Sequence, residues 1–93
     1  MTDEMLFGRE DLVKGVIELV KAQRIATGEV DGVGITVGMG RKVEKGLHGW
    51  AVWCVATYAG RGQKGEEIFG SKEKAEKYFE ELVKRHGLRE IAP

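Results

Sequence analysis

The chain has 93 residues, a length that suits one domain with a single hydrophobic core. Its 15 basic and 15 acidic residues give a formal net charge of zero, so no overall field draws it to nucleic acid or to a membrane surface. The charge is uneven, however, because residues 32–64 carry five basic residues and one acidic residue, a net of +4. We therefore expect one domain over residues 1–93, with a basic middle third.

The cysteine content and the apolar runs bear on where the protein resides. A single cysteine cannot form an internal disulfide, which favours a reducing compartment. The N-terminal segment is acidic and lacks the apolar stretch of a signal peptide. No apolar run approaches the roughly 20 residues that span a bilayer. These features predict a cytoplasmic protein that has no membrane partner.

In the first quarter of the chain, apolar residues recur with a helical period. One stripe of a helix holds Leu12, Val13, Val16, Ile17 and Val20. The pattern predicts a helix that begins near Thr2 or Asp3 and ends near Gly28, a residue type that commonly follows the last helical turn.

Residues 33–40 alternate between apolar and very small side chains, which predicts a strand with one nearly bare face. The bare face holds Gly34, Thr36, Gly38 and Gly40. Bare backbone allows close approach, either by Trp53 from a neighbouring strand or by a ligand or partner. Both explanations remain open at this stage.

Residues 49–59 are the longest apolar run and contain both tryptophans and the one cysteine. The β-branched and aromatic content favours a strand, and neither of its two faces is polar. A strand that is apolar on both faces belongs in the middle of a sheet, with both faces covered. This segment is therefore the predicted centre of the fold.

The remaining segments complete a predicted α+β fold. A basic loop over residues 41–49 links the two strands as an antiparallel pair, and a mobile glycine-rich tip over residues 59–65 precedes a short strand near residues 66–69. Ser71 is placed to cap a second helix that ends at Gly87, followed by a loosely held tail. The predicted order is α-β-β-β-α, a three-stranded antiparallel meander with two helices packed on one face.

The residues that could perform chemistry form no convincing constellation. Residues 60–65 match G-x-G-x-x-G, but a strand follows instead of the helix that a dinucleotide site requires. His48 and His86 lack metal-ligand spacing, and Cys54 lies inside an apolar run, where cysteine acts as a small hydrophobic residue. We therefore predict no catalytic residues, no metal site and no cofactor, and expect that the protein is not an enzyme.

Two sets of residues are candidates for partner binding. The basic groups of the predicted loops form a nucleic-acid set: Arg41, Lys42, Lys45, Arg61 and Lys64. In a meander the first three lie about 30 Å from the last two, a spacing that suits an extended polyanion. The open sheet face forms a protein interface set: Gly34, Thr36, Gly38, Gly40, Trp53 and Val55.

Two nucleic-acid-binding families share short motifs with the C-terminal third of the chain. The segment resembles the WGR domain in a set of matching residues: Gly60, Arg61, Gly62, Phe69, Ser71, Glu73, Ala75 and Phe79. It departs from that motif where Ala59 replaces the signature tryptophan and where one residue is missing after Arg61. Residues 70–75 are similar to the helix entry of double-stranded-RNA-binding domains, although Glu73 and Glu76 stand where that family prefers lysine. Both resemblances imply nucleic acid as a partner.

The sequence therefore predicts a small non-enzymatic binding module that acts on a macromolecule, with nucleic acid preferred through the basic loops. The alternative is a regulatory or protein-interaction protein that acts as a homodimer through the open sheet face.

Overall fold

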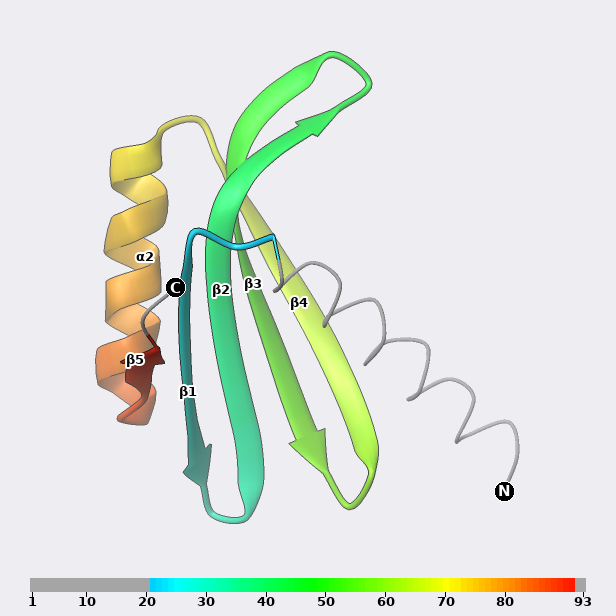
Figure 1. The fold of residues 1–93 in the computed structure, drawn as a ribbon, viewed down its shortest axis with the longest axis vertical. Helices are drawn as coiled ribbons and strands as arrows, with labels where there is room; N and C mark the ends of the chain where they lie inside the picture. Colours follow the sequence, from blue (N-terminus) through cyan, green and yellow to red (C-terminus); the bar gives the residue numbers. More distant parts are fainter. Residues whose placement is uncertain (1–20, 92–93) are drawn as a thin grey trace.

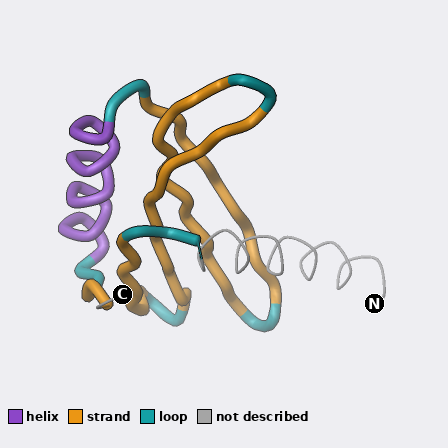
Figure 2. Tube along the Cα trace, turned by 45° about the horizontal axis from the view of Figure 1, so that its top comes forward, coloured by secondary structure: helices purple, strands orange, loops and turns teal. Residues whose placement is uncertain are grey.

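A computed structural model describes residues 21–91, which form a five-stranded antiparallel sheet and one helix (Figure 1). The elements in chain order are β1 (Arg24–Val30), β2 (Val33–Glu44), β3 (Leu47–Tyr58), β4 (Arg61–Phe69), α2 (Lys72–His86) and β5 (Arg89–Ile91). The strand order across the sheet is β4-β3-β2-β1-β5, so the first four strands form a meander and β5 adds to its edge. The tube in Figure 2 shows α2 lying along one face of this sheet.

The predicted α-β-β-β-α order is wrong. Among residues 21–91 the sheet has five strands instead of three, and one helix of this range, α2, packs on it in place of two on the same face. The end that we predicted for the first helix falls inside β1, which pairs with both β2 and β5. The rest of that predicted helix, up to residue 20, lies outside the described residues.

The central-strand prediction is confirmed. β3 pairs with β2 on one side and with β4 on the other, and it contributes buried residues to both faces of the sheet. Val52, on the face that α2 covers (the near face), is 2% exposed, and Trp53, on the opposite face (the far face), is 5% exposed. The antiparallel pairing of β2 with β3 is also as predicted, and Trp53 lies directly opposite Gly38.

Two-residue turns connect the first four strands. Each turn ends in glycine, and both turn residues have positive φ: 51° and 81° at Asp31–Gly32, 48° and 83° at Lys45–Gly46, and 52° and 81° at Ala59–Gly60. Two positive φ angles define a type I′ turn, whose twist matches that of the flanking strands. The predicted mobile tip over residues 59–65 is therefore wrong, because the turn takes two residues and β4 begins at Arg61.

The predicted signals at the ends of α2 are confirmed. The hydroxyl of Ser71 accepts a hydrogen bond from the backbone N–H of Lys74, and Gly87 adopts the left-handed conformation at the C-terminal end. The backbone N–H of Leu88 then donates to the carbonyl of Val83, which satisfies a carbonyl of the last turn. This turn directs the chain back along the sheet edge as β5.

The main core lies between α2 and the near face of the sheet. Its buried residues come from β1, β2, β3, α2 and the turn after α2: Ala26, Val37, Met39, Val52, Ala75, Phe79, Leu82 and Leu88. Ala75, Phe79 and Leu82 belong to the helical stripe that we predicted to be buried, and Tyr78 and Val83 of the same stripe are partly buried against this core. α2 is therefore held by an apolar face, as its sequence period indicates.

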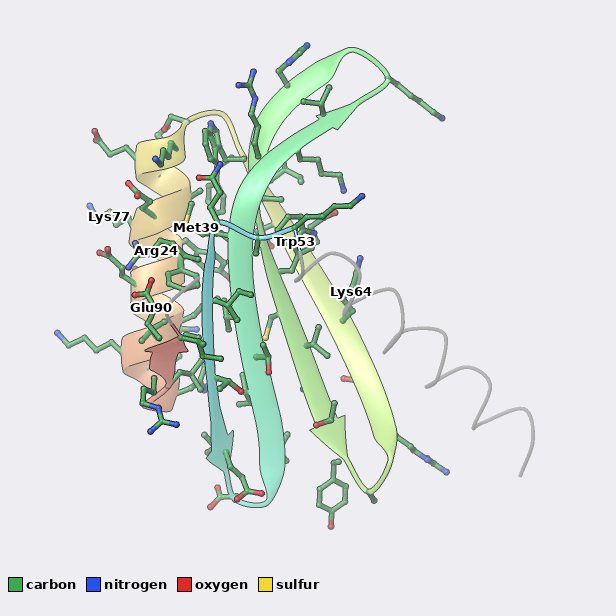
Figure 3. The ribbon with its side chains drawn as sticks, in the orientation of Figure 1. Arg24, Met39, Trp53, Lys64, Lys77 and Glu90 are labelled. Carbon is green, nitrogen blue, oxygen red and sulfur yellow. The ribbon has the colours of Figure 1, made fainter. Side chains whose placement is uncertain are left out.

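Arg24, the first residue of β1, joins three elements at this edge of the sheet. Its guanidinium donates hydrogen bonds of 2.8 Å to both carboxylate oxygens of Glu90 in β5 and one of 3.0 Å to Glu80 in α2. The same guanidinium lies 4.8 Å from the ring centroid of Phe79. Figure 3 shows Arg24 and Glu90 next to each other beside the helix.

Candidate nucleic-acid interface

The β2–β3 hairpin extends past its neighbouring strands. In the sheet register β1 reaches only Met39 and β4 reaches only Trp50, so within the described part of the chain residues 42–49 pair only with one another. We call this two-stranded segment the hairpin arm. Figure 1 shows it turning away from the rest of the sheet, at the end of the sheet from which the chain enters α2. With about three residues per strand, the arm projects roughly 10 Å.

Exposed basic side chains lie on the arm and at its base. Arg41, Lys45 and His48 are all exposed, and Val43 between them is 58% exposed. Arg41 pairs with Trp50 and Val43 pairs with His48, so these four side chains share the near face. Our prediction of a loop over residues 41–49 is wrong, because residues 41–44 and 47–49 are strand.

The start of α2 adds a cation to the same corner. The ammonium of Lys72 lies 5.6 Å from the ring centroid of the half-buried Trp50, a cation–π contact. Trp50 thus stands between the arm and the helix, with Lys72 on one side and Arg41 in the adjacent strand. An aromatic ring among basic groups is a combination that nucleic-acid-binding surfaces use.

Lys42 differs from the other cations of the predicted set. Its ammonium donates hydrogen bonds of 2.7 and 2.8 Å to both carboxylate oxygens of Glu66 in β4, and the indole N–H of Trp53 donates to the same carboxylate. The Lys42 and Glu66 side chains are 25% and 21% exposed. This pair fixes the base of the arm to β4, and Lys42 has little charge left to offer a phosphate.

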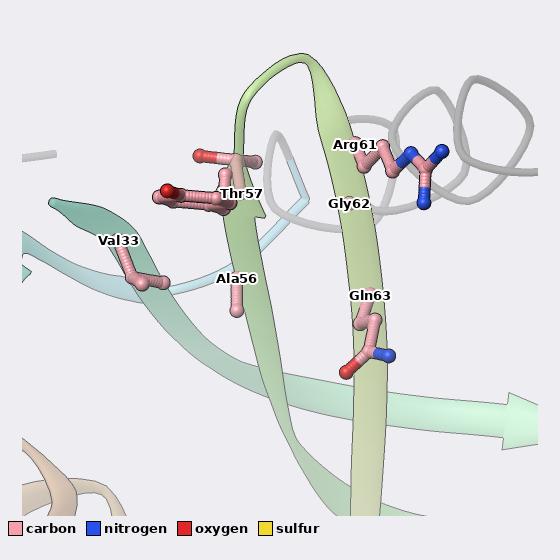
Figure 4. Close-up of a pocket in the computed structure, with 7 residues that line it drawn as sticks. Val33, Ala56, Thr57, Arg61, Gly62 and Gln63 are labelled. Atoms are coloured by element: carbon pink, nitrogen blue, oxygen red, sulfur yellow. The ribbon is translucent and has the colours of Figure 1, made fainter. Parts of the chain in front are cut away.

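The structure does not bring Arg61 and Lys64 together with the arm. Arg61 begins β4 at the opposite end of the sheet, and Lys64 lies within β4, half-buried on the far face opposite Val55. By the register, Arg61 is about eleven residues, roughly 36 Å, from the tip of the arm. Arg61 helps to line a shallow apolar hollow of about 260 Å³ with Val33 and Ala56 (Figure 4). This volume is below the range of pockets that enclose drug-sized ligands.

The predicted protein interface set does share one face, the far face. Gly38, Gly40, Trp53 and Val55 are buried, whereas Gly34 and Thr36 are half-buried. Gly40 is covered by the backbone of residues 21–23, which would lie 3.4–3.5 Å from a Cβ at that position. Because Trp53 and Val55 are each 5% exposed, these side chains offer little surface to a partner. The homodimer hypothesis for this face stays a prediction.

The groups that could perform chemistry are dispersed in residues 21–91. No three side chains of the histidine, cysteine or acidic types approach one another closely enough to hold a metal ion within this range. Cys54 is half-buried, and burial raises the pKa of its thiol, which opposes formation of the reactive thiolate. In the same range, no helix has the length and hydropathy needed to cross a membrane.

We call the surface formed by the hairpin arm, its base and the start of α2 the basic corner. Sequence reasoning missed four of its residues: Val43, His48, Trp50 and Lys72. The available signal was the strand alternation, which continues through Arg41 and Val43 on one side of the turn and through His48 and Trp50 on the other. A two-residue turn at Lys45–Gly46 would have placed the side chains of the four strand residues (Arg41, Val43, His48 and Trp50) on one face. The contact of Lys72 with Trp50 had no local signal, because it depends on how α2 packs.

Comparisons with known proteins add no assignment. No protein-family model matches the sequence, and neither the curated proteins nor the solved structures contain a significant match.

Proposed function

We propose that the protein is a non-enzymatic module that binds nucleic acid with the hairpin arm and the adjacent start of α2. The observation that carries the proposal is the projection of a two-stranded ribbon that bears exposed Arg41, Lys45 and His48. A major groove about 12 Å wide and 8.5 Å deep admits a two-stranded ribbon, and the arm projects by a similar length.

The basic residues of this corner have distinct roles in the proposal. Arg41, Lys45 and Lys72 contact phosphates, because each carries a full charge at an exposed position. Val43, exposed between them, contacts a groove or a base edge with its methyl groups. The Lys42–Glu66 pair supports the arm and does not contact the ligand. Arg61 and Lys64 are not part of this surface.

Salt dependence provides the test. Three phosphate contacts predict that affinity for duplex DNA falls roughly 40-fold between 50 and 200 mM salt, as a slope near −2.7 implies. The double variant Arg41→Ala/Lys45→Ala removes two of the contacts, so its affinity should fall only about fourfold over the same range. Fluorescence anisotropy with a labelled mixed-sequence duplex measures both slopes.

The control for this experiment has the same change in charge at a different place. Lys84→Ala/Arg89→Ala also removes one lysine and one arginine, both exposed, at the end of α2 and in β5. It should keep the wild-type slope. Equal slopes for the two double variants would reject the arm as the interface, and absence of binding by the wild type at low salt would reject the function.

A further inference from the structure

β4 is an outer strand of the sheet, and it is long for one. It has nine residues, whereas β5 at the opposite edge has three. Within residues 21–91, β4 pairs with β3 alone, so its outer backbone groups have no strand beside them in this range. β4 lacks proline, but four of its nine residues are charged, and such charges protect an edge from strands whose charges do not match. The edge is therefore a template only for a strand of complementary charge.

The turn before β4 determines which of its backbone groups face outward. A two-residue turn is closed by a hydrogen-bonded pair, here Tyr58 and Arg61, and hydrogen-bonded pairs then recur at every second residue. Gly65 therefore bonds inward to Cys54, whereas the N–H and C=O groups of four residues point outward: Gly62, Lys64, Glu66 and Ile68. An antiparallel strand must align these outward groups with its own, so registers differ by steps of two residues.

The charges of β4 select one of these registers when the added strand is a second β4. With Gly65 opposite Gly65, each Lys64 faces Glu66 of the second copy, and the reverse pair forms on the other side of the two-fold axis. The Glu66 carboxylate already accepts two hydrogen bonds from Lys42 and one from Trp53, which leaves one of its roughly four lone-pair sites for the lysine of the second copy. A two-residue shift in either direction places Lys64 opposite Lys64 or Glu66 opposite Glu66. Opposite charges in directly facing positions stabilise a strand pair, and like charges destabilise it.

From this self-complementary pattern we infer that the protein forms a homodimer by antiparallel pairing of two β4 strands about Gly65. The pairing joins the two sheets into one ten-stranded sheet with about eight new backbone hydrogen bonds. In this register even-numbered residues of one copy face even-numbered residues of the other, so the near faces of the two sheets are continuous. Both helices therefore lie on the same side of the joined sheet. Because the strands are antiparallel, the two hairpin arms point in opposite directions.

Disulfide trapping tests the register. The two Gly65 residues form a non-hydrogen-bonded pair with Cα atoms about 4.5 Å apart, a separation within the range of disulfides. A Cβ at Gly65 meets no atom within 4 Å, so the site accepts a cysteine. In a Cys54→Ala background, Gly65→Cys should form a covalent dimer on mild oxidation, without nucleic acid present.

The matched control is Glu67→Cys in the same background, two residues away on the same face. In the proposed register the two copies of residue 67 lie four residues apart, about 13 Å, which is too far for a disulfide. Equal trapping at both positions, or none at Gly65, would overturn the proposal.

Analytical sedimentation tests the pairing of Lys64 with Glu66 of the second copy, because it measures the dimer dissociation constant without a disulfide. Lys64→Glu places like charges opposite each other, so its dimer dissociation constant should rise at least tenfold, while circular dichroism reports an unchanged fold. Lys77→Glu makes the same change on the exposed surface of α2 and should dimerise as the wild type does. A monomeric wild-type protein would refute the dimer and would leave the arm hypothesis to its own salt test.

Discussion

Arg24 shows how one side chain can hold several elements together. It forms two hydrogen bonds to Glu90 and one to Glu80, and it lies over the ring of Phe79. The hydrogen bonds from its guanidinium also hold the pKa of the Glu90 carboxyl below its usual range. The attachment of the short strand β5 therefore depends on a charge that acid removes.

Acid should weaken this attachment in a predictable direction. A lowered folded-state pKa means that Glu90 contributes stability above its unfolded pKa and loses it as pH falls through the folded pKa. Glu90→Gln should cost less than about 1 kcal/mol at neutral pH, because the side chain is 40% exposed. The difference from wild type should vanish below the lowered pKa. Urea unfolding at a series of pH values measures it.

A matched variant shows whether the effect belongs to the Arg24 contact. Glu29→Gln removes one carboxylate from an exposed position in β1. The proposed role of Glu90 would be refuted if both variants lost the same stability, or if the cost of Glu90→Gln persisted in acid.

Residue contacts differed in how far the sequence could predict them. One of the two explanations for the bare face, that Trp53 of the neighbouring strand lies over its glycines, is confirmed, and the register that places Trp53 opposite Gly38 comes from the structure. The contacts of Glu66 with Lys42 and Trp53 could not be predicted, because they depend on the register of β4 against β3. That register is set by the turn at residues 59–60, which we had interpreted as part of a longer loop.

At the scale of elements, β1 was missed because its composition is atypical of a strand. Ala26 and Gly28 face the helix side, where bulk is excluded: a Cβ at Gly28 would lie 2.9 Å from Cδ2 of Leu88. Gly28 therefore permits close packing, although we predicted it as a helix end. The Asp31–Gly32 pair was the signal that could have identified the hairpin.

The turn between β3 and β4 offers a stabilising substitution. Ala59 has a φ of 52°, a left-handed conformation that costs an alanine roughly 1–2 kcal/mol and that asparagine tolerates better. Ala59→Asn should raise the free energy of unfolding by about 1 kcal/mol, measured by urea denaturation. Gly60→Ala should lower it, since φ there is 81° and no neighbour lies within 4 Å to compensate. Changes of the same sign would contradict the turn geometry.

At the scale of the whole molecule, one aromatic side chain links the helix to the sheet. Phe79 is fully buried in the core that β1, β2, β3 and α2 share. Phe79→Ala should cost about 3–5 kcal/mol, a large part of the 5–15 kcal/mol that typically stabilises a domain. Helix and sheet signals should therefore be lost together on mild heating, as followed by circular dichroism.

The control for this variant is an aromatic residue of similar size at the surface. Tyr58 is 63% exposed, so Tyr58→Ala should change stability by about 0.5 kcal/mol or less. Equal losses for the two variants, or separate transitions for helix and sheet, would show that this core does not unite the fold.

The overall architecture was predictable where one element carried its own pattern. The central strand, the bare-faced strand beside it and α2 have strong periodicity, and all three elements are confirmed. Only α2 carried clear end signals, since the two strands extend to Glu44 and from Leu47 into the predicted loop. The two strands added at one edge of the sheet depend on tertiary contacts, namely the packing of Leu88 and the bonds of Arg24. Of the charges of the candidate interface, only Arg41 and Lys45 were predicted, because Lys72 joins them through the packing of α2. The shape of the interface was not predictable, because it arises from unequal strand lengths.

The half-buried Lys42–Glu66 pair at the base of the hairpin arm has a consequence for the proposed release of nucleic acid. Ionic strength screens exposed charges far more strongly than sheltered ones, and Lys42 and Glu66 are sheltered while Arg41 and Lys45 are not. In the complex that we propose, added salt therefore weakens the phosphate contacts of Arg41 and Lys45, while the Lys42–Glu66 pair keeps the hairpin arm in position. Release of nucleic acid by salt would then leave the arm folded, and dilution of the salt would restore binding.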